Sequence, residues 1–283
     1  MRERLEREYR KLKSISSSGL LDKAVSEHIV DTVRVSRDAL QQARRIQLKS
    51  AVRDKTYFGF SAVAESRPVN QALYASDQED FDGLLQVFLN GFRGASDNEI
   101  VRSAYTLAYT VFAANDINEI GRKASATFFE ILIGHIMARA IGVSPRKRIR
   151  LPESDATLPT DYVFELGGNR RIHLPIKTST RERGVQAWVH QLVLDGIFGK
   201  GSFVGVFVVG AETKRNAKTG EVIEICVPQQ FAMFQARIAT ISGIYYLDPP
   251  ETYLRLSRTN TVQPIQIERF GTMFRDLQAL LHG

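Results

Sequence analysis

An aspartate and a lysine lie at the two ends of a predicted β-hairpin, and together they could do phosphate chemistry. Asp161 opens the outgoing strand, and Lys177 closes the returning strand 16 residues later. A short strand, a tight turn at Gly167, Gly168 and Asn169, and a strand back bring both residues near one sheet edge. Mg²⁺ prefers oxygen ligands, and a lysine beside a metal can polarise water or stabilise developing charge. The pair is therefore suited to phosphodiester hydrolysis.

Charged side chains follow the lysine directly, and their order suits the reading of base pairs. Arg181, Glu182 and Arg183 form the triplet, and Gln186 follows it. Arginine can donate two hydrogen bonds to guanine O6 and N7, and glutamate can accept from the cytosine amino group. Charge triplets before a helix are usually solvated turns held by local ion pairs. The position next to Lys177 favours base reading here.

The run from residue 159 to residue 191 resembles a known family. Pro159-Thr160-Asp161 and Pro175-Ile176-Lys177 resemble the two halves of the PD-(D/E)xK nuclease motif, and the continuation is KTSTRERGVQ. That continuation is similar to type II restriction endonucleases that read CCGG or CC-N-GG type sites. The resemblance implies Mg²⁺-dependent cleavage of double-stranded DNA at a short palindrome containing CC/GG. It also implies metal binding by Asp161 and a homodimer in which each protomer reads half of the site.

The sequence departs from this pattern at the second metal-binding acid. The position two residues before the lysine is Pro175, which cannot bind a metal, and the position thirteen residues after it is His190. The missing ligand could come from Gln186, His190 or Gln191, or a single acid could coordinate directly. Glu130, on the preceding predicted helix, is another candidate for both catalysis and metal binding, and a helix-surface role is equally compatible with its position.

Three other acids compete for the same roles. Glu212-Thr213-Lys214 is a literal E-x-K, but the acid before it, Asp195, lies in a predicted helix and the hairpin partner is missing. We therefore expect Glu212 and Lys214 to be turn residues or contacts to the DNA backbone. Asp155 is an alternative to the aspartate of the hairpin, and Glu165 is expected to face away from the site.

The composition is compatible with a polyanionic partner. The formal net charge is +7, a moderate excess. Basic residues are concentrated at Arg146, Lys147, Arg148 and Arg150, where they could follow a phosphate backbone or form a solvated loop. Cys226 is the only cysteine, which excludes an internal disulfide and a cysteine-based zinc site.

Several common readings find no support. The sequence has no P-loop, no GxGxxG and no GxSxG, so no nucleotide cofactor or serine hydrolase is expected. There is no apolar run long enough for a membrane span and no secretory signal, which predicts a cytoplasmic protein. His28, His135 and His173 lack partners at metal-ligand spacing and are expected to be structural. Trp188 is expected in the core.

The order of predicted elements indicates an α/β fold. The expected architecture is a PD-(D/E)xK nuclease core, a mixed central sheet flanked by helices, with a helical N-terminal subdomain. Residues 1–115 form the helical region, for dimerisation or DNA contacts, and residues 116–283 form the catalytic and recognition core. Helices are expected at 20–48, 80–92, 97–114, 116–141, 184–198, 229–240 and 271–282, and strands at 162–166, 171–177, 203–209, 221–227 and 243–247, with 59–70 as a loop.

Two alternatives to a restriction enzyme remain open. The same fold could serve a repair or defence nuclease with little sequence specificity. It could also belong to a non-catalytic DNA-binding relative, because the second acid is absent at both expected positions.

Overall fold

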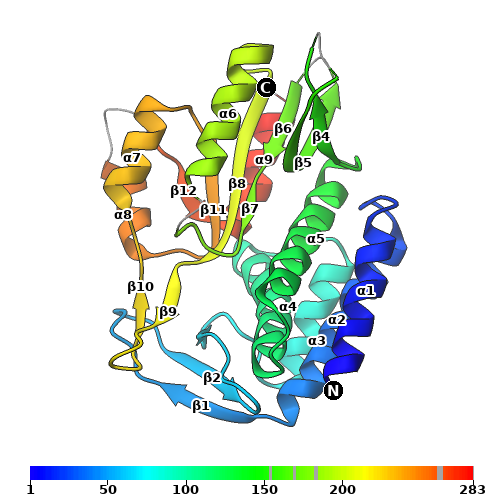
Figure 1. Cartoon of the computed structure of the whole chain (residues 1–283), viewed down its shortest axis with the longest axis vertical. Coiled ribbons are helices and arrows are strands. Elements are labelled where there is room, and N and C mark those ends of the chain that lie inside the picture. Colours follow the sequence, from blue (N-terminus) through cyan, green and yellow to red (C-terminus); the bar gives the residue numbers. More distant parts are fainter. Residues whose placement is uncertain (153–154, 168–169, 182–183, 260–263, 283) are drawn as a thin grey trace. The chain divides into compact units, whose positions relative to one another are not determined.

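The computed structural model describes residues 1–152, 155–167, 170–181, 184–259 and 264–282 (Figure 1). The chain forms two compact units. One comprises Met1–Ile136 with Thr213–Ile225, and the other Met137–Glu212 with Cys226–Gly283. The division falls inside helix α5 (Arg122–Ile141) rather than at residue 115. The first unit therefore includes a segment from far along the chain.

The first unit is mainly helical, as expected for the first half of the sequence. Its helices are α1 (Arg2–Ser16), α2 (Lys23–Gln41), α3 (Gln78–Leu89), α4 (Asp97–Ile117) and most of α5. Its strands are β1 (Arg44–Leu48), β2 (Tyr57–Ser61), β3 (Val69–Asn70), β9 (Thr213–Arg215) and β10 (Val222–Glu224). Val222 packs with Leu48 and Tyr57 in a small apolar cluster, which ties the late segment to the early one.

Two expectations for this unit were wrong. The helix expected over residues 20–48 ends at Gln41, and the chain continues as strand β1, which pairs antiparallel with β2. The apolar residues Leu40 and Ile46 are six positions apart, which breaks helical spacing. The loop expected over residues 59–70 contains most of β2 and all of β3. Isolated apolar residues in such short strands give almost no periodic signal.

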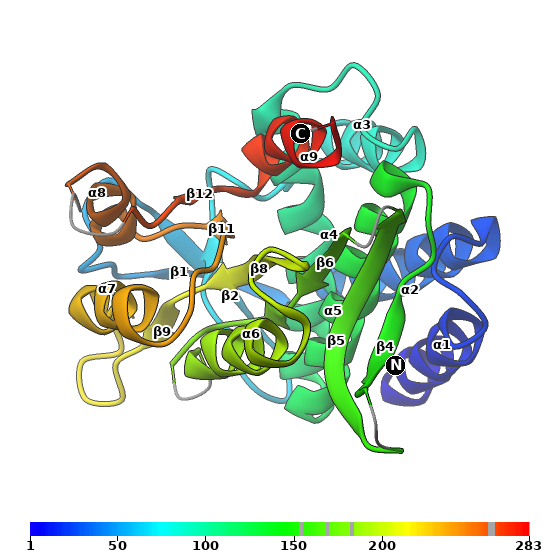
Figure 2. The same cartoon turned by 90° about the horizontal axis from the view of Figure 1, so that it is seen from above.

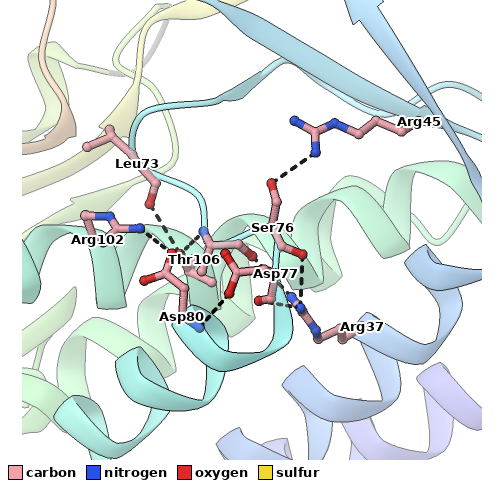
Figure 3. A network of polar contacts seen from close by, with 9 residues as sticks. Arg37, Arg45, Leu73, Ser76, Asp77, Asp80, Arg102 and Thr106 are labelled. Atoms are coloured by element: carbon pink, nitrogen blue, oxygen red, sulfur yellow. Dashed lines mark hydrogen bonds and ion pairs between the residues drawn. The ribbon is translucent and has the colours of Figure 1, made fainter.

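Side chains of the first unit hold the segment that leads into α3 (Figure 3). Arg37 on α2 is buried and donates hydrogen bonds to the backbone carbonyls of Ala75, Ser76 and Asp77 at 3.2, 3.2 and 2.9 Å. Its guanidinium also lies over the ring of Phe81, 3.9 Å from the centroid. Further contacts join Thr106 to Leu73, Arg45 to Ser76 and Arg102 to Asp80. The buried guanidinium of Arg37 is thus a scaffold group rather than a phosphate ligand.

Among the described residues, one helix, α5, is long enough and apolar enough to cross a membrane, judged by length and composition alone. This was not predicted from the sequence. About two thirds of its most apolar window, 67%, is buried inside the protein. A helix that packs in the core of a protein is expected to be apolar and buried in this way, so the length and composition of α5 do not by themselves indicate a membrane span.

The second unit is built on a mixed sheet of seven strands (Figure 2). The strand order is β12-β11-β8-β6-β5-β4, with β7 paired to β8. The strands are β4 (Arg146–Arg150), β5 (Thr157–Gly167), β6 (Arg170–Leu174), β7 (Ile176–Lys177), β8 (Phe203–Ala211), β11 (Gly243–Asp248) and β12 (Ile267–Arg269). The pairs β4–β5 and β5–β6 are antiparallel, whereas β6, β7 and β11 all run parallel to β8.

Helices cover both faces of this sheet. Trp188 on α6 (Val185–Phe198), Phe231 on α7 (Pro228–Arg237) and Tyr253 on α8 (Glu251–Thr259) pack with Phe207 and Tyr246 of the sheet. On the other face, Tyr245 donates a hydrogen bond to Asp276 on α9 (Met273–His282) at 2.6 Å. Trp188 is fully buried, as expected. The expected strand at residues 203–209 is also confirmed, and β8 is buried along almost its whole length. The mixed α/β architecture follows the sequence prediction.

Candidate active site

Asp161 and Lys177 lie side by side in the second unit. The Lys177 ammonium Nζ is 2.8 Å from Asp161 Oδ2, and the backbone N–H of Ile176 donates to the same oxygen at 2.8 Å. Their side chains retain 20% and 24% of their exposure, so the pair is partly shielded but accessible to a ligand. The expected proximity of the two residues is confirmed. The aspartate lies within an eleven-residue strand, however, and not at its start.

Pro175 creates the geometry of this pair. The hairpin register places Tyr162 opposite Leu174, so the next residue along, Pro175, would follow in the ladder beside Asp161. Proline has no N–H to donate, and its carbonyl accepts from Val208 on β8 at 3.0 Å. The chain therefore leaves β5 at this point and joins β8 as β7. Pro175, which stands where the family pattern has an acid, thus marks the point beside the ion pair at which the chain begins to pair with β8.

Two histidines lie near this pair. His173 on β6 is fully buried, and its ring centroid is 6.0 Å from that of His190 on α6. His173 Nδ1 lies 3.4 Å from Gln191 Oε1, while its Nε2 has no hydrogen-bond partner among the described residues. Burial lowers the pKa of His190, with the Asp161 charge opposing the shift and Lys177 adding to it. Burial thus favours the neutral form of both rings.

The expectation that His173 is a satisfied structural histidine was wrong. Burial is the main cause that lowers its pKa, to about 4, and the Asp161 and Lys177 charges both act on it. A histidine on a short apolar strand gives no sign of such neighbours in the sequence. The Nδ1 of His28 is likewise buried with no hydrogen-bond partner among the described residues. His135 is buried and bonded to Ser26 at 2.7 Å, which confirms its structural role.

His173→Asn is expected to make folding less sensitive to acid. The folded pKa is about 4, against about 6.5 in the unfolded chain. Between these values only the unfolded state binds the proton, so the contribution of neutral His173 is complete above pH 6.5 and is lost as pH falls through 4. Wild type should lose up to about 3 kcal/mol more unfolding free energy than the variant between pH 7 and pH 4. Urea denaturation at the two pH values measures the unfolding free energy. Equal losses in wild type and variant would contradict the lowered pKa of His173.

The alternative ligands are placed differently. Gln191 is buried, and its amide nitrogen donates to Asp195 Oδ1 at 2.8 Å and to the Phe203 carbonyl at 2.9 Å. Gln191 is therefore occupied as a core residue, whereas Gln186 is exposed in the first turn of α6. Glu130 belongs to the first unit, on α5. Its role as a ligand stays a prediction.

The competing acids lie elsewhere on the second unit. Asp155 is fully exposed and pairs with Arg150 at 3.2 Å, and the exposed Glu165 pairs with Arg146 at 3.2 Å. Neither is in the ion pair with Lys177, so Asp161 is the aspartate of the hairpin site. Among the described residues, no group of three or more histidines, cysteines and acids is arranged to hold a metal.

The basic residues expected to contact DNA form an edge strand. Arg146, Lys147, Arg148 and Arg150 are exposed on β4 rather than in a loop, and Ile149 is the buried member. Lys147 lies over the ring of Tyr162 at 5.0 Å from its centroid. Charged side chains protect sheet edges from pairing with other chains. This strand can therefore follow a phosphate backbone or serve as such an edge.

The triplet expected to read bases begins four residues after Lys177. Arg181 is exposed, and Glu182 and Arg183 lie outside the described residues. Thr180 and Gly184, which flank the triplet, are buried. The Gly184 N–H donates to the Thr180 carbonyl at 2.7 Å, so the two residues that flank the triplet lie together.

Glu212 is not the exposed turn residue expected from the sequence. It follows β8, is fully buried, and accepts hydrogen bonds from Thr180 and Tyr246. Burial raises its pKa to about 7, although those hydrogen bonds and the Arg181 charge oppose the shift. Lys214 lies two residues on in β9, which belongs to the first unit. The literal E-x-K is thus divided between two units.

Comparison with known proteins places this arrangement in a structural class. No protein-family model matches the chain, and neither does any curated protein. The chain resembles the crystal structure of the type IIP restriction endonuclease Kpn2I with a TM-score of 0.82 and 24% sequence identity, over 99% of this chain and 96% of that one. This chain has a restriction-endonuclease fold. The fold accounts for the mixed sheet with flanking helices that the sequence predicted.

A second solved structure, a complex of the restriction endonuclease PspGI with substrate DNA, matches with a TM-score of 0.43 and 13% identity, over 72% of this chain and 92% of that one. The restriction-endonuclease fold of this chain is established on the first similarity and not on this one.

Proposed function

We propose that this chain is a type II restriction endonuclease that hydrolyses double-stranded DNA at a short palindromic site containing CC/GG. The observation that carries the proposal is the ion pair of Asp161 on β5 and Lys177 on β7, at 2.8 Å, in a restriction-endonuclease fold. We further propose that it acts as a homodimer, because a palindrome presents two identical half-sites to a two-fold symmetric protein. We also propose that it acts in the cytoplasm.

The residues at the pair are compatible with Mg²⁺. Asp161 Oδ2 is used by Lys177 and Ile176, and Oδ1 makes no hydrogen bond to any residue that the structure describes. Mg²⁺ is commonly held by one or two carboxylates while substrate phosphates and water complete its shell. Asp161 would therefore hold the ion, with Glu130 or His190 as further proposed ligands. A bound ion would supply charge neutralisation and a lowered pKa for water.

Lys177 and the histidines carry the rest of the proposed mechanism. The Lys177 ammonium can donate hydrogen bonds to the attacking water and to a non-bridging phosphate oxygen, where it offsets the charge that develops during attack. His190 is half-buried, and burial lowers its pKa, so its neutral form could accept a proton from water. Arg181, Glu182 and Arg183 would read G·C base pairs, and Lys147 and Arg148 would contact the phosphate backbone.

Cleavage of a plasmid in the presence of Mg²⁺, followed by run-off sequencing of the ends, tests this proposal. Discrete fragments with a common terminal sequence support a restriction enzyme and give both site and stagger. A smear of fragments would support a nuclease with little sequence preference.

Arg183→Ala separates these two nucleases. For a restriction enzyme, loss of a bidentate contact to guanine should cost roughly 1–3 kcal/mol of discrimination at that base pair, or about 5- to 150-fold. A competition assay with duplexes that differ at one base pair measures it. The half-buried Arg170 at the other end of the hairpin region offers no such contact in this proposal, so Arg170→Ala is the matched control. A uniform weakening on all sequences would instead indicate a phosphate contact.

A non-catalytic DNA-binding protein is the second candidate. It is favoured by the single carboxylate in the ion pair and by the lack of a metal-holding cluster among the described residues. Site-specific binding with no metal-stimulated cleavage would support it.

A further inference from the structure

Glu212 makes an unusual set of contacts for a buried acid. Its Oε1 accepts from the Thr180 N–H at 2.9 Å and from the Thr180 hydroxyl at 2.6 Å, and its Oε2 lies 3.2 Å from the same N–H. The Tyr246 hydroxyl donates to Oε1 at 3.1 Å from β11. One residue, Thr180, thus donates both its backbone and its side-chain hydrogen bond to a single carboxylate.

These contacts end a continuous attachment of one segment to β8. Ile176 and Lys177 pair with Val208 and Val209, and the Ala211 N–H then donates to the Thr178 carbonyl at 3.1 Å. A side chain at Gly210 would place its Cβ 2.7 Å from that carbonyl, so the two backbones approach closely there. Glu212 makes the last contact along this path, with Thr180. Thr180 lies three residues after Lys177 in the sequence.

The far end of the triplet returns to the same residue. The Gly184 N–H donates to the Thr180 carbonyl at 2.7 Å, and a Cβ at Gly184 would lie 2.9 Å from Thr180. The residues on the two sides of the triplet, Thr180 and Gly184, are therefore in direct contact. Any displacement of Thr180 moves both ends of the triplet.

We propose that Glu212 is a positioning residue for base recognition, which anchors the Arg181–Arg183 segment to the sheet through Thr180. The inference rests on the proposed function, because it assumes that this segment reads base edges. Hydrogen bonds weaken steeply with distance and angle, so a displaced anchor should reduce discrimination between sites more than it reduces non-specific DNA binding. Because Thr180 is attached to Lys177 through the same path along β8, the anchor also joins recognition to the active site.

Two substitutions test the anchor, and two serve as controls. Glu212→Gln keeps the shape but replaces one acceptor oxygen by a donor, and Thr180→Val removes only the hydroxyl. Thr180→Ser restores both hydrogen bonds. Tyr245→Phe is the matched control, because it also removes a buried tyrosine–carboxylate hydrogen bond, to Asp276 on the other face of the sheet.

The first readout is amide hydrogen exchange of the peptide that spans residues 178–184, with no DNA present. We expect exchange at least about tenfold faster in Glu212→Gln and Thr180→Val than in wild type, and unchanged exchange in Thr180→Ser and Tyr245→Phe. The second readout is the ratio of cleavage rates on the preferred site and on a site with one base pair changed. That ratio should fall about tenfold in the first two variants and stay within about twofold in the controls.

The outcomes separate the anchor from the function. Unchanged exchange and an unchanged ratio in Glu212→Gln overturn the anchor, and an equal fall in Tyr245→Phe overturns it in favour of general core damage. If wild type does not select a sequence, the proposed function fails and base positioning fails with it. The exchange data then still report whether Glu212 holds the segment.

Discussion

Replacement of Asp161 by asparagine is expected to abolish Mg²⁺-dependent DNA cleavage, with a rate loss of at least about 10³-fold. Asparagine keeps the shape of the side chain but loses the negative charge, so it can neither hold the cation strongly nor pair with Lys177 at 2.8 Å. Single-turnover cleavage of a labelled duplex measures the loss. Duplex binding in Ca²⁺ or without metal should remain within about tenfold of wild type, since Arg181–Arg183 and the β4 cations are intact.

Asp155→Asn is the matched control for this variant. It removes the same charge from a fully exposed aspartate of the same unit, which pairs with Arg150. Its cleavage rate should be close to that of wild type, because exposed pairs of this kind contribute little. An Asp161→Asn protein that cuts at near the wild-type rate, or an Asp155→Asn protein that does not, would place the metal elsewhere.

Lys177→Met should lower the cleavage rate by about 10²- to 10³-fold, which is typical for the loss of one group that stabilises transition-state charge. Methionine keeps most of the length of the lysine stem and removes the ammonium. The effect should fall on kcat rather than on DNA binding, because the ammonium would act on the reacting phosphate and water under the proposed mechanism. Steady-state kinetics with separate binding measurements distinguish the two.

Lys214→Met is the control for the second variant, because Lys214 belongs to the literal E-x-K that rivals the Lys177 motif. It is exposed on β9, in the other unit from Asp161. We expect unchanged kcat and at most a small loss of affinity at low salt, from one lost phosphate contact. The reverse result, with Lys214 essential and Lys177 dispensable, would transfer the active site to the rival motif.

The sequence predicts the part of the site whose residues lie close together along the chain. Asp161 lies on the first strand of the β5–β6 hairpin, and Lys177 follows shortly after the second, so their spacing and the turn are enough to bring them together. Pairing between parallel strands brings together residues that a crossover helix separates in the sequence. Patterns of neighbouring residues therefore do not predict which residues meet. The contact of Thr180 with Glu212, 32 residues away, arises in this way. His173 was missed for a related reason, since its neighbours come from α6 and β5.

The fold shows the same division. Strongly apolar elements such as β8 and α5 are found near their expected positions, because burial on several sides leaves a clear signal. β4 was missed because its exposed charges resemble a loop, although an edge strand needs only one buried side chain to pack. Bounds also shifted where a strand extends into polar sequence, as at the start of β5.

The division of the chain into interleaved units has a consequence during synthesis. Leu48 and Tyr57 complete their packing only with Val222, whose N–H donates to the Lys49 carbonyl at 2.8 Å. At about 5–20 residues per second, a ribosome needs roughly 10–30 s to make the intervening chain. The unit with Asp161 and Lys177 likewise receives β11 and β12 from residues beyond 225. We therefore expect the nascent chain to stay incompletely folded, and without an assembled second unit, until β11 and β12 have been synthesised.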